Sequence, residues 1–262
     1  MSQTQIFSGG GAWTLDDARW DGVIFSAGAQ DTSQNGVVFS VSGTSMYMCG
    51  DTGNEVNQYN LTTPFDLSTA SFSQVFNVSA QGAGPRGVSF RTNGLKMFVA
   101  GNVSSASDGE VNEYTLASAW NVSSASFLTG VSVSANSQVP NAAAFRNNGT
   151  KMFIIYGNTI AINEYSLASA WTVSGASFTQ SFDVSNQFVS PTGLFIRSDG
   201  LKAFVGGNAR VAEYTLTSAW DISTSTFVQS FSPSGDFAAA TFRDDGNKMY
   251  TLGGNNVRQF SL

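Results

Sequence analysis

The chain of 262 residues contains no histidine and only one cysteine, Cys49. The absence of imidazole excludes Ser-His-Asp and Cys-His triads, together with metal sites built on histidine. A lone cysteine excludes an internal disulfide and a cysteine-based zinc site. Because Cys49 lies within an apolar run at 46–49, we interpret it as a small buried hydrophobe. We therefore expect no catalytic residue, no metal and no cofactor.

Charged residues are also scarce, at 11% of the chain, and the net charge is −6. The twelve lysines and arginines mostly recur at fixed repeat positions, so no basic stripe for nucleic acid is expected. No run of about 18 apolar residues exists to enter a membrane. The segment Met1–Gln5 has neither the charge nor the apolar core of a signal peptide, so none is expected.

What the sequence does contain is a pattern of aromatic residues that repeats about every 50 residues. The first set ends short strand-like runs at Tyr59, Tyr114, Tyr165, Tyr214 and Phe260. The second set follows six residues later, at Phe65, Trp120, Trp171 and Trp220. Phe260 has no such continuation because the chain ends at Leu262, but Trp13 and Trp20 supply the missing part at the other end. A period of this size is typical of propellers and solenoids.

Each copy predicts four short strands, the first small and apolar, and the first two joined by an Asn-Gly or Asp-Gly hairpin. Five copies of four antiparallel strands predict an all-β fold, a five-bladed β-propeller whose last blade is closed by the N-terminal strand. The predicted blades are residues 31–79, 80–134, 135–185, 186–232, and 233–262 with 12–30. A linear solenoid is the alternative, but it requires capping units rather than complementary halves. We expect the tryptophans to anchor each blade onto its neighbour.

Three kinds of charged residue recur in the repeat. They are Arg91, Arg146, Arg197 and Arg243; Lys96, Lys151, Lys202 and Lys248; and Glu113, Glu164 and Glu213. The first blade lacks all three and has Ser40, Ser45 and Gln58 instead, which suggests that the charges form one self-balancing unit. We interpret them as structural ion pairs, with a ring of functional cations as the alternative. Two adjacent carboxylate pairs, Asp16-Asp17 and Asp244-Asp245, are interpreted as turn residues rather than a glycosidase pair.

Two sets of loops vary between copies: those joining the second strand to the third and those joining successive blades. In a propeller both sets lie on one face, which is then free to bind a ligand. That face holds a recurring Gly-Asn or Gly-Asp pair, whose polar members are Asp51, Asn102, Asn158, Asn208 and Asn255. These are either hairpin turn residues or a ring around the channel mouth that binds sugars or a cation, with Tyr156 or a tryptophan as stacking platform.

Two segments of the repeat, 93–98 and 111–123, resemble a propeller repeat common in marine bacterial and phage proteins, and 62–71 comes closest to its second half. In phage genomes such repeats look like parts of tail, fibre or capsid-surface proteins. The resemblance implies a non-enzymatic virion surface module that contacts other virion proteins or host surface glycans. It is assembled in the host cytoplasm, and its oligomeric state stays open.

Two alternative functions remain. The first is a lectin with five sugar sites, like five-bladed propeller lectins of the tachylectin type. The second is a carboxylate hydrolase, with or without Ca²⁺, because the repeat is also similar to lactonase-like and surface-layer propeller repeats. Those propellers have more blades, and their catalytic residues have no identifiable counterparts here. The obvious carboxylates for the second alternative are Asp51, Asp108, Asp199 and Asp245.

Overall fold

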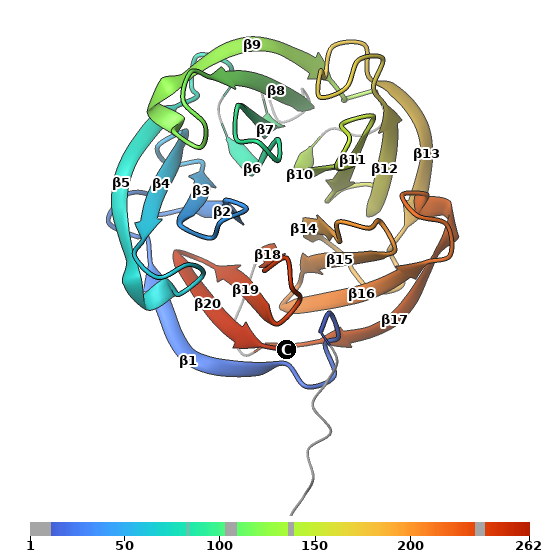
Figure 1. Ribbon diagram of the computed structural model, residues 1–262. Coiled ribbons are helices and arrows are strands. Elements are labelled where there is room, and N and C mark those ends of the chain that lie inside the picture. Colours follow the sequence, from blue (N-terminus) through green and yellow to red (C-terminus); the bar gives the residue numbers. More distant parts are fainter. Residues whose placement is uncertain (1–11, 83, 103–108, 136–138, 234–238) are drawn as a thin grey trace, which may run out of the picture.

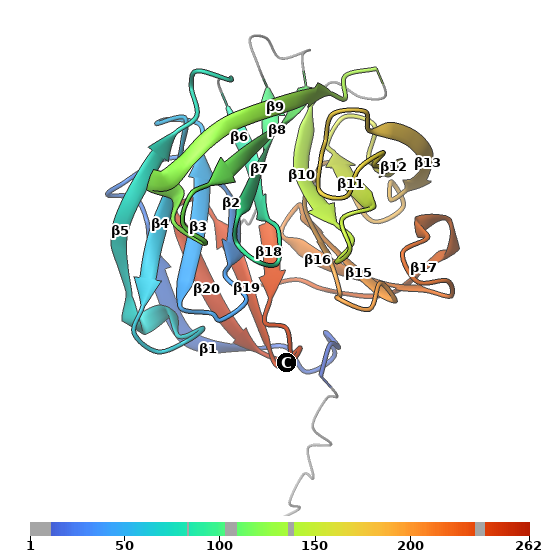
Figure 2. The ribbon, with the colours of Figure 1, turned by 45° about the horizontal axis from the view of Figure 1, so that its top comes forward.

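The computed structural model describes residues 12–82, 84–102, 109–135, 139–233 and 239–262. Five four-stranded antiparallel sheets stand around a central axis as the blades of a propeller (Figure 1). This arrangement confirms the predicted fold class. Figure 2 shows the same ring tilted, with the blades splayed around the axis.

Each blade runs outward from a strand beside the axis. The innermost strands are β2 (Gln34–Phe39), β6 (Pro85–Phe90), β10 (Pro140–Phe145), β14 (Pro191–Ile196) and β18 (Ala239–Phe242). The second strands are β3 (Ser45–Gly50), β7 (Lys96–Asn102), β11 (Lys151–Tyr156), β15 (Lys202–Gly207) and β19 (Lys248–Gly253). The third strands are β4 (Glu55–Leu61), β8 (Gly109–Leu116), β12 (Ala161–Ser166), β16 (Arg210–Leu216) and β20 (Asn256–Ser261). The outer strands are β5 (Ala70–Asn77), β9 (Ala125–Ser132), β13 (Ser177–Asp183), β17 (Ser225–Phe231) and β1 (Arg19–Ser26).

The ring closes between the two ends of the chain. Strand β1 pairs antiparallel with β20, from Arg19 opposite Ser261 to Ser26 opposite Asn256, so blade five contains both ends of the chain (Figure 1). Asp21 secures this pairing, since its carboxylate accepts hydrogen bonds from Lys248 at 2.6 Å and Ser261 at 2.6 Å. Pairing of this kind covers the edge that β20 would otherwise expose.

Three of the inter-blade prolines begin strands rather than lying in loops. Pro85, Pro140 and Pro191 are the first residues of β6, β10 and β14. This position suits proline, which has no N–H to donate to a sheet. Three short 3-10 helices, which the sequence analysis did not predict, follow the third strands: η1 (Leu67–Thr69), η2 (Val122–Ser124) and η3 (Ile222–Thr224).

The core lies between neighbouring blades, in clusters that each combine strands from two sheets. The repeated tyrosines are buried there, each in edge contact with a phenylalanine of its own outer strand, as Tyr114 is with Phe127 at 5.8 Å. Tyr114 also meets Phe76 of the preceding blade at 5.5 Å. Cys49 is fully buried and free, and burial raises the pKa of its thiol to about 12.

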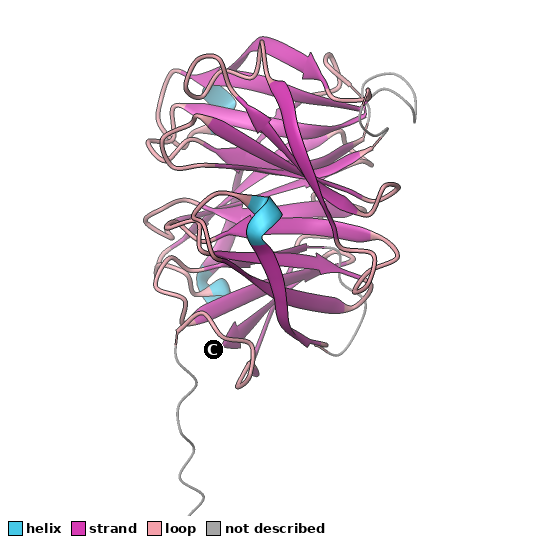
Figure 3. Cartoon of the chain, turned by 90° about the vertical axis from the view of Figure 1, so that its right-hand side faces the viewer, coloured by secondary structure: helices cyan, strands magenta, loops and turns pink. Residues whose placement is uncertain are grey.

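The two faces of the ring carry different loops (Figure 3). We call the face with the turns between first and second strands the anchor face; it also carries the 3-10 helices and the tryptophan loops. The opposite face carries the turns between second and third strands and the connections between blades, and we call it the loop face.

Candidate functional site

The anchor face is built around one repeated contact between an aromatic ring and a glycine. Its members are Trp13 on Gly246, Phe65 on Gly43, Trp120 on Gly94, Trp171 on Gly149 and Trp220 on Gly200. Each aromatic residue donates its backbone N–H to the carbonyl of its glycine, at 2.9–3.0 Å. Each adopts a positive φ of 60–69°, which is rare for a bulky side chain. A Cβ on any of these glycines would lie only 2.1–2.4 Å from the ring, so the hairpin glycine is required twice, for its φ and for space.

The same aromatic residues join each blade to the one before it. The Trp171 ring of blade three lies 6.2 Å from Phe98 of blade two and 5.7 Å from Phe145 of its own blade, measured between ring centroids. Its carbonyl accepts a hydrogen bond from Lys96 of blade two at 2.7 Å. Trp20, by contrast, is 51% exposed on the outer strand β1 and does not share this contact.

In every blade the backbone carbonyl of this aromatic residue accepts a hydrogen bond from the preceding blade, but two kinds of side chain donate it. A lysine donates in blades two, three and four: Lys96 to Trp171, Lys151 to Trp220 and Lys202 to Trp13. A tyrosine hydroxyl donates in blades one and five: Tyr47 to Trp120 and Tyr250 to Phe65, both at 2.6 Å. The corresponding residues of the other three blades are Phe98, Phe153 and Phe204, which lack the hydroxyl.

The repeated glutamates pair with these lysines inside the same blade. The pairs are Lys96 with Glu113, Lys151 with Glu164 and Lys202 with Glu213. Each glutamate side chain is at most 2% exposed. Glu113 also accepts a hydrogen bond from the backbone N–H of Val173 in the next blade, at 2.9 Å. In blade one Gln58 plays this part for Val122 at 3.1 Å, so the acceptor oxygen persists where the lysine and the charge are lost.

The arginines of the repeat make different contacts from the glutamates. Arg91, Arg197 and Arg243 lie 5.3–6.0 Å over the aromatic rings of Trp171, Trp13 and Phe65, each in the following blade. Arg197 and Arg243 also pair with Asp199 and Asp245 in their own turns, at 2.6 Å and 3.1 Å. Arg146 occupies the corresponding position after β10. The charges grouped together in the sequence analysis are therefore two separate sets. The arginines follow the first strand of their blades and lie over the aromatic rings. The lysines begin the second strand and pair with the glutamates.

The carboxylates considered for hydrolysis do not gather in one place. Asp199 and Asp245 lie in turns of the anchor face, whereas Asp51 lies in a turn of the loop face, at the far end of the strands. Asp16 and Asp17 are exposed, and burial together with the Asp245 charge raises the pKa of Asp244. Asp108 lies outside the described residues. Among the residues that the structure describes, no three Asp, Glu or Cys side chains gather to hold a metal ion.

The five polar residues proposed as a ring on the loop face are not structurally equivalent. Pairing with the innermost strand ends at Gly50, Gly101, Tyr156 and Gly207, so Asp51, Asn102 and Asn208 each follow directly. The same register places Asn158 and Asn255 one residue later, because the glycines that precede them, Gly157 and Gly254, already lie beyond the positions that correspond to Gly50 and Gly207. All five lie at the turns between the second and third strands, away from the axis. The channel mouth on the axis is formed by the innermost strands, so these five residues do not surround it.

The surroundings of the five residues also differ. Asp51, Asn158 and Asn208 are exposed, and Asn102 and Asn255 are partly buried. The Asn208 side chain accepts hydrogen bonds from the backbone N–H groups of Val189 at 3.2 Å and Ser190 at 2.9 Å, which ties the β15–β16 turn to the preceding inter-blade loop. The positive φ of Asn208, 51°, is the turn conformation that asparagine tolerates well.

A groove opens on the loop face of blade four beside Asn208. It encloses about 270 Å³ and is lined by the inter-blade residues 185–189 together with Asn208 and Arg210. The Val189 side chain is 76% exposed there, whereas Phe188 is buried beneath the loop. Arg210 uses one guanidinium hydrogen on the carbonyl of Gln187, at 3.1 Å, and makes no ion pair with the carboxylates that the structure describes. Its other N–H groups are available to a ligand.

Charge at this position differs between blades. The residue paired with the end of the second strand is Glu55 in blade one, Glu110 in blade two, Ala161 in blade three, Arg210 in blade four and Asn256 in blade five. Burial raises the pKa of Glu110, an effect that a hydrogen bond with Asn112 opposes. Only blade four offers a cation here among the five, so the loop face carries one distinctive site rather than five equal ones.

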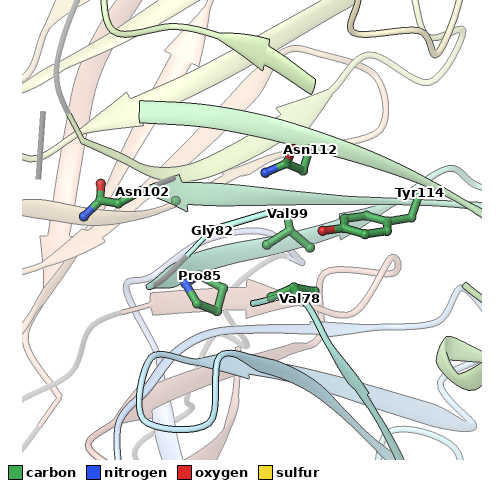
Figure 4. Close-up of a pocket in the computed structure, with 8 residues that line it drawn as sticks. Val78, Gly82, Pro85, Val99, Asn102, Asn112 and Tyr114 are labelled. Atoms are coloured by element: carbon green, nitrogen blue, oxygen red, sulfur yellow. The ribbon is translucent and has the colours of Figure 1, made fainter. Parts of the chain in front are cut away.

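The matching space between blades one and two is nearly filled. Figure 4 shows it lined by Val78, Val99 and Tyr114, with Asn102 at one end. Its volume is about 10 Å³, and the Oδ1 atoms of Asn102 and Asn112 beside it are buried without a hydrogen-bond partner in the described residues. A space of this size suits a single water molecule, not a sugar.

Comparison with known proteins shows the fold alone. A solved structure of a functionally unknown protein from Desulfotomaculum acetoxidans is similar, with a TM-score of 0.51 and 10% identity. The match covers 84% of this chain and only 62% of that protein, so this chain spans less than two thirds of its length. No protein-family model and no curated protein matches the sequence. The described residues include no helix long and apolar enough to cross a membrane.

Proposed function

We propose that this protein is a non-enzymatic binding module of a virion surface, which holds its shape through the anchor face and makes contacts through the loop face. The observation that carries the proposal is the blade-four groove, where Asn208 and Arg210 offer N–H donors beside the exposed Val189. A few placed polar groups beside apolar surface are the usual composition of a ligand site. The virion setting rests on the likeness of segments 93–98 and 111–123 to phage propeller repeats.

The virion setting is tested by mass spectrometry of purified particles from the source. The proposal expects peptides of this chain at a fixed ratio to the capsid or tail proteins through successive purification steps. Free protein in the cell lysate, with none in the particles, would remove the virion part and leave the binding module to be tested separately.

A lectin is the second candidate, and the groove favours a version with one site rather than five. About 270 Å³ is close to the lower end of small-ligand pockets, roughly 300 Å³, and suits one sugar ring. The Arg210 guanidinium matches a sugar carboxylate, since its fork of donors suits planar anions. We therefore expect recognition of a uronic or sialic acid type of sugar.

A glycan array with multivalently displayed protein tests the lectin candidate. Wild-type protein is expected to bind acidic sugars, and Arg210→Gln to lose at least tenfold in apparent affinity. Asp51→Asn is the matched control, because it changes a charge on the same face in blade one and leaves the groove intact. Equal binding by Arg210→Gln and wild type would contradict a site at this groove.

A further inference from the structure

A second feature of the loop face lies on the propeller axis, where the five innermost strands crowd together. A Cβ on Gly36 would lie 3.0 Å from the carbonyl oxygen of Arg86, and one on Gly87 only 2.8 Å from the Cα of Ala142. The remaining axial cavity has a volume of about 40 Å³. Its deeper wall is an apolar collar made of Val37, Val88, Ala143, Leu194 and Ala240. The channel is therefore narrow, and it becomes apolar below its mouth.

The described residues at the mouth of this channel are polar, and one of them, Arg86, is charged. A small cavity of about 20 Å³ is lined by Asn35, Arg86, Asn141 and Thr192, which hold corresponding positions in blades one to four. Arg86 is partly buried, and its Nε atom is fully shielded without a hydrogen-bond partner in the described part of the chain. No described carboxylate forms an ion pair with Arg86. A shielded cation without a counter-ion is unfavourable.

The neighbours of Arg86 add hydrogen-bond donors rather than negative charge. The Nδ2 atom of Asn35 donates to the carbonyl of Pro85 at 3.1 Å, and that of Asn141 donates to the carbonyl of Pro191 at 2.8 Å. Each of these nitrogens carries a second hydrogen that the carbonyl does not use. The mouth therefore combines a guanidinium with spare amide donors above a closed apolar collar.

We propose that the axial mouth binds one compact monovalent anion, held by the Arg86 guanidinium with the amides of Asn35 and Asn141. The volume limits the ligand, because cavities of about 20 and 40 Å³ hold roughly one to three water-sized groups. A halide ion fits this space, and so does a carboxylate as small as acetate. The site is separate from the blade-four groove and does not depend on the function proposed for that groove.

Thermal unfolding in bromide tests the site, with sodium gluconate replaced stepwise by sodium bromide at constant ionic strength. Gluconate has a six-carbon chain and exceeds the cavity. The wild-type unfolding midpoint is expected to rise by about 3 °C once bromide reaches roughly ten times its dissociation constant.

Arg86→Gln is expected to lose this rise. Arg146→Gln, which changes an arginine on the opposite face, is the matched control and is expected to keep it. No rise in wild type, or the same rise in Arg86→Gln, would overturn the proposal.

Bromide-soaked crystals of the wild-type protein supply a measurement that does not depend on a variant folding. An anomalous peak within hydrogen-bonding distance of the Arg86 guanidinium is expected, and its absence at a bromide concentration that raises the midpoint would overturn the assignment. A parallel titration with acetate distinguishes a carboxylate ligand from an inorganic one. A rise with acetate assigns the site to carboxylates as well, and a rise with bromide alone assigns it to an enclosed inorganic anion.

Discussion

The anchor face and the loop face are built from the same five copies, yet they treat those copies differently. On the anchor face every blade keeps the contact between aromatic ring and glycine, and every blade receives a hydrogen bond at the carbonyl of that aromatic residue. On the loop face the corresponding positions hold glutamate, alanine, arginine and asparagine. Repetition is kept where blades must fit one another and lost on the face that we propose binds a ligand.

The comparison also shows which property of a repeated residue matters. Lysine and tyrosine both donate to the carbonyl, and glutamate and glutamine both accept from the next blade. The hydrogen bond is therefore constant although the charge is not. A buried ion pair adds little net stability beyond what its hydrogen bonds supply, which explains why blade one can omit it.

Loss of ring closure is the largest effect we predict. Deletion of residues 1–26 removes β1 and leaves β20 with an open edge beside an uncovered core. We expect no folded monomer, with the protein unfolded or associated, as judged by size-exclusion chromatography and circular dichroism. A synthetic peptide of residues 12–30 added in trans is expected to restore the monomer. A truncated chain that stays monomeric and folded without the peptide would contradict circular closure.

Removal of one anchor ring comes next. Trp171 is 6% exposed between blades two and three. Trp171→Ala is therefore expected to lower the free energy of unfolding, measured in urea, by about 3–5 kcal/mol. Val189→Ala on the loop face, where the side chain is 76% exposed, is the control and should change stability by less than about 0.5 kcal/mol. Similar costs for the two variants would erase the difference between the faces.

The ion pair of blade three provides a sharper test of the hydrogen-bond argument. Glu164→Gln leaves Lys151, whose side chain is 27% exposed, without its counter-charge and should destabilise the protein by about 2 kcal/mol. The triple variant Lys151→Ser, Phe153→Tyr, Glu164→Gln gives blade three the residues of blade one at these positions. It should recover at least half of that loss in urea unfolding. A triple variant less stable than Glu164→Gln would show that the charge itself matters.

For Asp21 we predict a smaller effect on stability, which depends on pH. Burial opposes ionisation, but hydrogen bonds from Lys248, Ser261 and Gln259 together lower the pKa of this carboxyl below 3.8. Its contribution is therefore complete above the unfolded-state pKa and is lost as pH falls through the folded-state value. Asp21→Asn should cost about 1–2 kcal/mol at neutral pH, and the gap to wild type should shrink below about pH 4. A gap that stays constant down to pH 2 would argue against this role.

The sequence alone was enough for the closed ring. Trp13 and Trp20 complete the copy that ends at Leu262. Trp13 belongs to the core between blades four and five, whereas Trp20 continues the spacing on the exposed outer strand β1. Contacts that cross between blades were harder to predict. Lys96 and Lys151 donate to carbonyls 75 and 69 residues away, and nothing in the spacing separates these lysines from the arginines that lie over the rings.

The residues of the two proposed binding sites were missed for a different reason. Arg86 and Arg210 each occur in one blade only, so a search for repetition passes over them. The signal for the channel mouth appears when the copies are compared at the second residue of the innermost strand. That position holds Asn35, Arg86, Asn141 and Thr192 in blades one to four. The proposed ring of five does not line up because the Gly-Asn pairs of blades three and five lie one residue further along the chain, relative to the strand register, than the pairs of the other blades.

Two arginines of blade four, on opposite faces, test the division between the faces most directly. Arg197 pairs with Asp199 and lies 5.9 Å over the Trp13 ring, whereas Arg210 lines the groove. Both are changed to glutamine, and acidic-sugar binding and the urea midpoint are measured for each. The account predicts that Arg197→Gln lowers the midpoint and keeps binding, and that Arg210→Gln keeps the midpoint and loses binding. The opposite pattern, or the loss of both properties in either variant, would contradict it.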